Sequence, residues 1–198
     1  MPTYRTVATA AKVELKIEKS VFLGQAAATA DLEAAKAFIG AIRAEHRQAT
    51  HVCYAYRLGD EPGAVTYLSD HGEPAGTAGK PILGAILHRD LTDVTVVVTR
   101  YFGGKKLGVR GLIEAYGAAA SAALDAAGML TLTRLLPVRL ACPYDKLPAL
   151  TRAIRQAGGE SAAPEYDAEK VTLAARIPVE ALPALEAALA ALSALRLT

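Results

Sequence analysis

The pattern of apolar and polar positions predicts alternating strands and helices along the first part of the chain. Period-two alternation indicates strands, and apolar residues spaced by three and four indicate helices. Asp31 is a candidate N-cap for the first helix, and Gly128 ends the last one. The predicted strands cover residues 4–17, 20–29, 50–58, 64–69 and 94–102, and the predicted helices cover residues 31–46, 82–90 and 109–127.

The second part of the chain has a different order of elements. A break near residues 133–137 is followed by strand, helix, strand, strand, helix and strand, which is typical of a ferredoxin-like domain. These segments cover residues 138–142, 145–156, 160–166, 170–176, 179–191 and 194–198. The chain is therefore predicted to be an α+β protein, with an N-terminal domain over residues 1–134 and a C-terminal domain over residues 135–198.

Composition favours a folded protein outside the membrane. Hydrophobic residues make up 52% of the 198 positions and charged residues 21%, and no apolar run is long enough and free enough of charge to span a membrane. The first residues lack the apolar region of a signal peptide, so a cytoplasmic location is expected. Cys53 and Cys142 are the only cysteines, which excludes a disulfide framework and an all-cysteine zinc site.

Charge is nearly balanced over the whole chain. Residues 1–136 carry 15 Lys and Arg against 13 Asp and Glu, and residues 137–198 carry 7 against 7. Neither part resembles a polycation that coats nucleic acid without specificity. Any recognition of an anion must therefore be local.

The strongest local signal runs from Val94 to Gly111, where a β-branched strand breaks at a glycine pair and continues as a helix. Four cations fall within eleven residues there, with no acid among them. Free backbone N–H groups and the helix dipole make such a junction a natural anion site, although a merely solvated loop is the alternative. Residues 100–110 are called the basic turn. Its candidate anion- or nucleic-acid-binding residues are Arg100, Tyr101, Phe102, Gly103, Gly104, Lys105, Lys106 and Arg110.

A second candidate is the polar, glycine-rich segment over residues 69–81, called the glycine loop. Its glycines permit backbone conformations closed to other residues and leave N–H groups accessible. It is not a P-loop, because Pro81 follows Gly79-Lys80. A loop that contacts a ligand or partner and a purely structural turn both fit this segment. The candidate residues are Asp70, His71, Gly72, Glu73, Gly76, Thr77, Gly79 and Lys80.

A third pattern is His51-x-Cys53, which places two reactive side chains on one face of a strand. If acids of the glycine loop lie nearby, this pattern is compatible with a zinc site or with a cysteine nucleophile. A buried cysteine beside a hydrogen-bonded histidine fits the same pattern and is the more common case. No catalytic residue, metal or cofactor is therefore assigned.

The motifs resemble those of the YigZ/IMPACT family. The matching stretches cover most of residues 19–117, and the resemblance of the C-terminal part to the extra domain of bacterial members is less specific. The stretches are Lys19-Ser20-x-Phe22, His51-x-Cys53-x-Ala55-Tyr56, Gly72-Glu73-Pro74-x-Gly76-Thr77-Ala78-Gly79-x-Pro81-Ile82-Leu83, and Val96-Val97-Val98-Thr99-Arg100-Tyr101-Phe102-Gly103-Gly104-x-Lys106-Leu107-Gly108.

The resemblance implies two folds that recur among translation proteins. These are a ribosomal protein S5 domain 2-like N-terminal domain and a ferredoxin-like C-terminal domain similar to the last domain of EF-G. Eukaryotic IMPACT members regulate translation initiation and carry an additional N-terminal partner-binding domain, the RWD domain, which this chain is expected to lack. Fold likeness to translation factors is analogy only.

The sequence departs from the family pattern in two places, one in the glycine loop and one in the helix that follows the basic turn. His71 follows Asp70 where the family has a second Asp, which weakens the case for a two-carboxylate metal site. Arg110 and Glu114 replace a small residue and an Arg in the next helix, and their i,i+4 spacing predicts an ion pair. The positive charge is thus moved towards the start of the helix.

The leading hypothesis is a non-enzymatic binding protein that contacts RNA, the ribosome or a translation-associated protein. The basic turn would bind phosphate, and Tyr101 or Phe102 would stack on a base. The alternative is a small-molecule protein or enzyme that holds a phosphorylated metabolite, with Asp70, His71, Glu73 or His51 as acid–base groups. A third reading places a protein partner on the C-terminal domain. Oligomeric state and the adjacency of the loop and the turn stay open.

Overall fold

The structure, a computed structural model, describes residues 3–59, 62–192 and 194–197. Tyr4–Leu132 form one compact unit, called the N-terminal unit, and the chain from Thr133 onward forms a second, called the C-terminal unit. Part of the turn predicted between the strands of the hairpin, residues 60–61, lies outside the described residues, as does residue 198 of the last predicted strand.

The N-terminal unit is built on a five-stranded antiparallel sheet with the strand order β2-β3-β6-β4-β5. Its strands and those of a separate β1–β7 pair are β1 (Thr3–Val7), β2 (Ala11–Ile17), β3 (Ser20–Ala28), β4 (His51–Leu58), β5 (Val65–Ser69), β6 (Val94–Tyr101) and β7 (Met129–Thr133). Its helices are α1 (Leu32–Glu45), α2 (Gly79–His88) and α3 (Gly108–Ala127).

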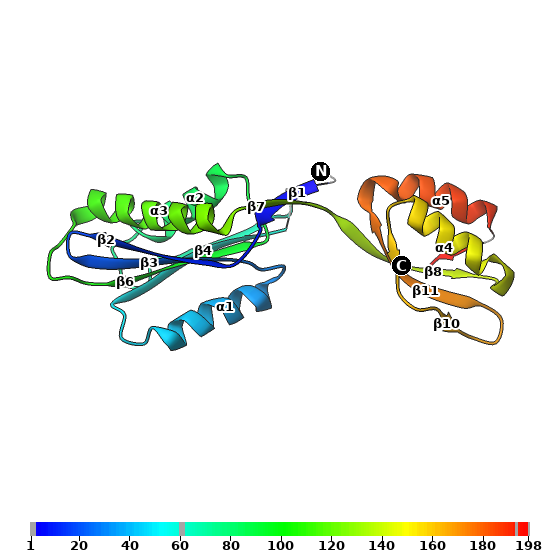
Figure 1. The fold of residues 1–198 in the computed structure, drawn as a ribbon, viewed down its shortest axis with the longest axis horizontal. Helices are drawn as coiled ribbons and strands as arrows, with labels where there is room; N and C mark the ends of the chain where they lie inside the picture. Colours follow the sequence, from blue (N-terminus) through cyan, green and yellow to red (C-terminus); the bar gives the residue numbers. More distant parts are fainter. Residues whose placement is uncertain (1–2, 60–61, 193, 198) are drawn as a thin grey trace. The chain divides into compact units, whose positions relative to one another are not determined.

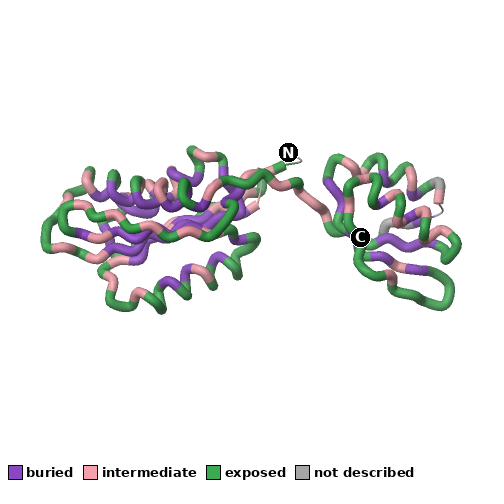
Figure 2. Tube along the Cα trace, viewed as in Figure 1, coloured by how far each residue is buried: buried purple, intermediate pink, exposed green. Residues whose placement is uncertain are grey.

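Helices cover both faces of this sheet. Helix α1 packs on one face, and α2 and α3 pack on the other (Figure 1). Figure 2 shows the buried residues concentrated in the strands and on the helix sides that face them. The apolar run of β6 is buried because β6 is the central strand and is covered on both faces. Apolar residues at helical spacing likewise place the buried stripe of α3 on the sheet.

Two details differ from the predicted elements of this unit. The strand predicted over residues 4–17 is interrupted, because the N–H groups of Ala8 and Thr9 each donate to carbonyls at the end of α3 (Gly128 and Ala127, both 3.1 Å). The chain then resumes as β2. Strand β7 was not predicted at all, since its residues show little alternation and are mostly exposed.

The C-terminal unit has a four-strand path in the order β10-β11-β8-β12, with β9 also pairing with β11. Its elements are β8 (Leu135–Cys142), a short 3₁₀ turn at Tyr144–Lys146, α4 (Leu147–Gln156), β9 (Glu160–Ser161), β10 (Glu165–Tyr166), β11 (Val171–Pro178), a second 3₁₀ turn at Val179–Ala181, α5 (Leu182–Ala191) and β12 (Leu195–Arg196). The break predicted at residues 133–137 was wrong in part, because β8 already begins at Leu135 and pairs through the exposed Pro137.

Candidate functional site

A buried ion pair joins the glycine loop to the end of strand β6. The Arg100 Nη1 atom donates to Glu73 Oε1 at 2.6 Å, and both side chains are at most 6% exposed. The Tyr116 hydroxyl on α3 donates to the same carboxylate oxygen at 2.8 Å. The loop and the basic turn, which are far apart in sequence, therefore meet at one end of the sheet.

Aromatic rings enclose the guanidinium of this pair. The Arg100 Cζ atom lies 5.4 Å from the ring centroids of both Phe22 and Phe102. Such contacts favour a cation when it is removed from water. Arg100 is therefore held inside the protein and is not among the exposed cations available to a phosphate, which revises its expected role.

Asp70 holds the start of helix α2. Its Oδ1 accepts from the backbone N–H groups of Ala78 (2.9 Å) and Gly79 (2.8 Å), and its Oδ2 accepts from that of Gly76 (2.8 Å). Burial alone would raise the pKa of Asp70, but these three donors and Lys80 outweigh it and hold the pKa below its ordinary value. With both oxygens engaged, Asp70 serves as a cap, and the acid–base role considered for it has no geometric support.

Two histidines fasten the loop to strand β4. The Nδ1 atom of His71 accepts from the Val52 N–H at 3.1 Å, and the His71 carbonyl lies 3.0 Å from Nδ1 of His51. Desolvation, then the charges of Arg43 and His51, lower the pKa of His71, in agreement with a neutral ring that accepts a hydrogen bond.

One imidazole lies near a buried carboxylate, although the two groups are too far apart for a direct hydrogen bond. The Nε2 atom of His51 lies 3.8 Å from Glu73 Oε2, and the His51 side chain is 19% exposed. A carboxylate behind a partly accessible imidazole is a common acid–base arrangement. This pair is the best-placed candidate in the described residues for chemistry on a small molecule.

Cys53 lies on the same face of strand β4 as His51, but it is not placed to act as a nucleophile. Its side chain is fully buried, and its Sγ lies 2.9 Å from the Asp70 carbonyl. Burial raises the pKa of the Cys53 thiol to about 12, so little of the thiolate needed for nucleophilic attack is present near neutral pH. His51-x-Cys53 therefore fits the second alternative, a buried cysteine beside a hydrogen-bonded histidine.

We expect this buried thiol to reduce alkaline stability. Unfolding lets Cys53 ionise from about pH 8.5, whereas the folded protein keeps the proton, so stability falls by about 1.4 kcal/mol per pH unit above that value. Urea unfolding of the wild type and Cys53→Ala from pH 8 to 10.5 measures the difference. Cys142→Ala should change the pH dependence in the same direction, because burial also raises the pKa of the Cys142 thiol. Parallel curves for wild type and Cys53→Ala would contradict the assignment.

The two glycines of the basic turn are favoured for different reasons, Gly103 by packing and Gly104 by its backbone conformation. A Cβ atom on Gly103 would lie 1.8 Å from the Lys19 carbonyl oxygen, so only glycine fits there. The Gly103 N–H donates to Ser20 Oγ at 3.2 Å and is not free for an anion. Gly104 is exposed with φ +87°, a conformation that favours glycine.

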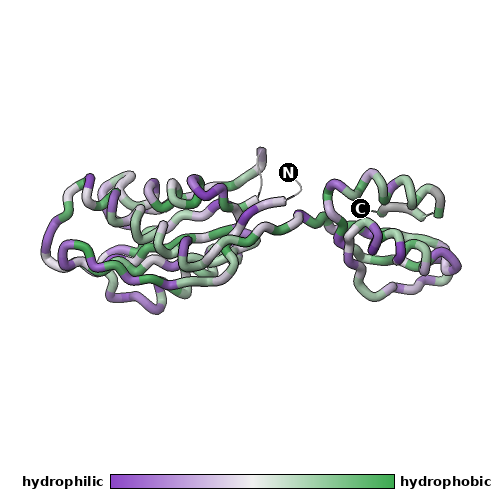
Figure 3. The backbone as a smooth tube through the Cα atoms, turned by 45° about the horizontal axis from the view of Figure 1, so that its top comes forward, coloured by the Kyte–Doolittle hydropathy of each residue, from purple (hydrophilic) through white to green (hydrophobic). Residues whose placement is uncertain are grey.

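The remaining cations of the turn are exposed. Lys105 pairs with Glu18, and Arg110 pairs with Glu114 at 2.8 Å, which confirms the ion pair predicted from their spacing. Lys106 has no acidic partner among the described residues. A hollow of about 520 Å³ lined by both lysines and both acids lies beside the turn. Figure 3 shows hydrophilic chain at this end of the unit.

Four other candidate residues lie outside these contacts. The Tyr101 hydroxyl lies 2.9 Å from Nδ1 of His46, next to the end of α1 and away from Phe102, because neighbouring residues of a strand face opposite ways. Thr77 is buried and donates to the Pro74 carbonyl at 2.7 Å. Lys80 is exposed, and Gly72 packs beside His51.

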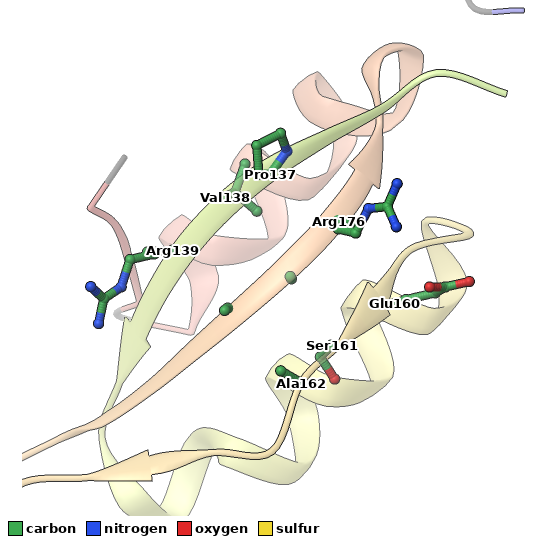
Figure 4. A pocket seen from close by; sticks show the side chains of 9 residues that line it. Pro137, Val138, Arg139, Glu160, Ser161, Ala162 and Arg176 are labelled. Carbon is green, nitrogen blue, oxygen red and sulfur yellow. The ribbon is translucent and has the colours of Figure 1, made fainter. Parts of the chain in front are cut away.

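A separate hollow of about 610 Å³ lies on the C-terminal unit, against β8, β9 and β11. Figure 4 shows Arg139 and Arg176 projecting from the two paired strands, with Glu160 and Ser161 on the neighbouring segment. Small apolar residues make up much of the remaining lining. None of the residues selected from the sequence lines this hollow.

The described residues contain neither a metal-binding cluster nor a membrane-spanning helix. Within residues 3–59, 62–192 and 194–197, no group of three or more His, Cys, Asp and Glu side chains is arranged to hold a metal ion. No helix among these residues is both long and apolar enough to cross a membrane.

Comparison with known proteins places both units in known families. Residues 18–124 match the Impact N-terminal domain, and residues 140–194 match a domain of unknown function, DUF1949. The chain is 39% identical to the IMPACT family member YigZ of Escherichia coli over 77% of this chain and 76% of that protein. It is 41% identical to an IMPACT family member of Thermus thermophilus over 82% and 86% of the two chains.

A solved structure extends the similarity to the fold. The crystal structure of a hypothetical protein is 36% identical to this chain, covers 96% of it and 92% of its own length, and superposes with a TM-score of 0.76. The similarity therefore includes both units and supports a mixed α/β, two-domain architecture.

Proposed function

Because the chain belongs to the IMPACT family, we propose that it is a cytoplasmic, non-enzymatic binding protein with a role in translation. It would contact RNA, the ribosome or a translation-associated protein through the exposed part of the basic turn. The family resemblance supports the link to translation, since eukaryotic members regulate its initiation. We further propose the ribosomal protein S5 domain 2-like and ferredoxin-like assignments for the two units, supported by their strand orders.

The observation that carries this proposal is the rigid base of the turn. The Glu73–Arg100 pair and the close approach of Gly103 to Lys19 fix both the strand end and the first bend. Lys105, Lys106 and an exposed Phe102 are therefore presented without a large cost of ordering. The surface pairs with Glu18 and Glu114 are weak in water, so a phosphate can displace these acids.

Binding to isolated ribosomal subunits and short RNAs over a salt series tests the proposal. We expect affinity to fall steeply with salt, and the double variant Lys105→Ala/Lys106→Ala to reduce the slope by about one to two. The matched control is Arg152→Ala/Lys170→Ala, which removes the same charge from exposed sites on the C-terminal unit. Binding that does not respond to salt, or that responds equally in both variants, would sink the proposal.

A second candidate function rests on the His51–Glu73 pair. Its partly exposed imidazole lies beside the glycine loop, where a small phosphorylated ligand could place a reacting group. A thermal-shift screen with nucleotides and sugar phosphates examines this function. A large specific stabilisation that is lost in His51→Ala would favour an enzyme or small-ligand protein over the binding protein.

A further inference from the structure

A groove of about 400 Å³ lies between helix α1 and strands β4 and β5. Its strand residues are Tyr54, Tyr56 and Tyr67, on the sheet face that packs against α1. Arg100 and Cys53 belong to the other face, so this groove is separate from the candidate site. Strand β5 is an edge strand, which leaves this side of the sheet open to a partner.

The tyrosines form a continuous stack. The Tyr67 ring lies 6.1 Å from that of Tyr54 and 5.6 Å from that of Tyr56, with interplanar angles of 24° and 18°. Tyr56 and Tyr67 are direct cross-strand partners. Tyr67 is 51% exposed, although burying an aromatic ring is strongly favourable. Tyr67 therefore supplies the exposed aromatic face of the stack, since the Tyr56 ring beneath it is only 8% exposed.

The charge at the groove is positive. The Arg43 Cζ atom lies 5.2 Å from the Tyr54 ring centroid, and Lys36 lies on the same lining. Lys36 pairs with Glu33 at 3.1 Å, but both side chains are largely exposed. Among the described residues that line the groove, none is acidic. A guest with flat, apolar faces and negative charge fits these surroundings.

Helix α1 leaves room for such a guest at Gly40. A Cβ atom on Gly40 would meet nothing within 4 Å, so packing does not require glycine there. Glycine inside a helix costs about 1 kcal/mol relative to alanine. This position lines the groove, so its lack of a side chain widens the space over the tyrosines.

We propose that this groove binds a single-stranded nucleic acid. A base would stack on the exposed ring of Tyr67, and phosphates would contact Lys36 and Arg43. This combination of a stacking surface and cations is the general mode of single-strand recognition. A duplex is disfavoured because its base faces are covered. The proposal does not depend on the basic turn, which is a different surface.

Fluorescence anisotropy with labelled 12-nucleotide oligo-U and oligo-A probes tests the groove. We expect Tyr67→Ala to weaken binding at least about fivefold, whereas Tyr67→Phe, which keeps the ring, stays within about twofold of the wild type. Gly40→Leu is expected to weaken binding as well, by filling the groove, without lowering the melting temperature. Tyr166→Ala, which removes a more exposed tyrosine from the C-terminal unit, is the control.

Wild-type affinity in both Tyr67→Ala and Gly40→Leu would overturn the groove proposal. The groove proposal would also be overturned if Lys105→Ala/Lys106→Ala abolished oligonucleotide binding and the groove variants did not. The basic turn would then be the RNA-binding surface. A proline-rich peptide that binds through Tyr67, with no binding of either oligonucleotide, would assign the groove to a peptide and also overturn it.

Discussion

Glu73→Gln is expected to lower the free energy of unfolding by about 3 to 5 kcal/mol. The substitution keeps the shape of the side chain but leaves the Arg100 guanidinium buried without its counter-ion. A guanidinium cannot release its proton near neutral pH, so the cost cannot be avoided by a change of protonation. The rings of Phe22 and Phe102 offset only part of it. Urea unfolding at pH 7 measures the change.

The double variant Glu73→Gln/Arg100→Met separates charge from packing. It removes both charges and keeps an unbranched apolar side chain beneath the rings, so most of the lost stability should return. Tyr116 keeps an acceptor in the amide oxygen of the new Gln. A single variant within about 1 kcal/mol of the wild type, or a double variant no better than the single one, would contradict a tight buried pair.

Most helices and strands could be predicted because their apolar residues recur with a period that is visible within each segment. The stripe of α3 and the β-branched run of β6 are periodic, and the structure places both close to the predicted residues. Strand β7 lacks such a pattern and forms by pairing with β1, at the other end of the N-terminal unit. Pairing between distant segments leaves little trace in either segment alone.

The roles of the site residues were harder to predict than their positions. Arg100 was read as an exposed cation because it lies beside Lys105 and Lys106 in sequence. The available signal was its place at the end of an apolar strand, since a charge on a strand buried on both faces needs an acid nearby. Glu73 supplies that acid, but no sequence pattern pairs two residues from such distant segments.

The tyrosine groove was missed for a similar reason. The pattern Tyr54-x-Tyr56 was visible within a predicted hairpin, but its meaning depended on the register that brings Tyr67 opposite Tyr56. Register across a hairpin depends on the turn between its strands. The arginine that completes the groove comes from α1, which no local pattern places over these strands.

Asp70→Ala is expected to lower the free energy of unfolding by about 2 to 4 kcal/mol, the largest expected loss after that of Glu73→Gln. Three backbone N–H groups lose their acceptor, and two of them belong to the fully or largely buried Ala78 and Gly79. Asp31→Ala is the matched control, because Asp31 caps α1 through one exposed bond to Ala34 (2.8 Å) and should cost about 1 kcal/mol. Equal losses in the two variants would contradict the cap assigned to Asp70.

The pH dependence of stability shows whether Asp70 caps α2 as a charged carboxylate or only as an uncharged hydrogen-bond acceptor. The pKa of Asp70 is lower in the folded protein than in the unfolded chain, so its contribution is present above about pH 4 and is lost as the pH falls further. The stability difference between wild type and Asp70→Ala should therefore shrink below pH 4, as measured by urea unfolding from pH 6 to 2.5. A difference that stays constant over this range would mean that the carboxylate charge does not hold the start of α2. The loop that carries Glu73 would then owe its position to the Arg100 pair and to the histidine contacts with β4.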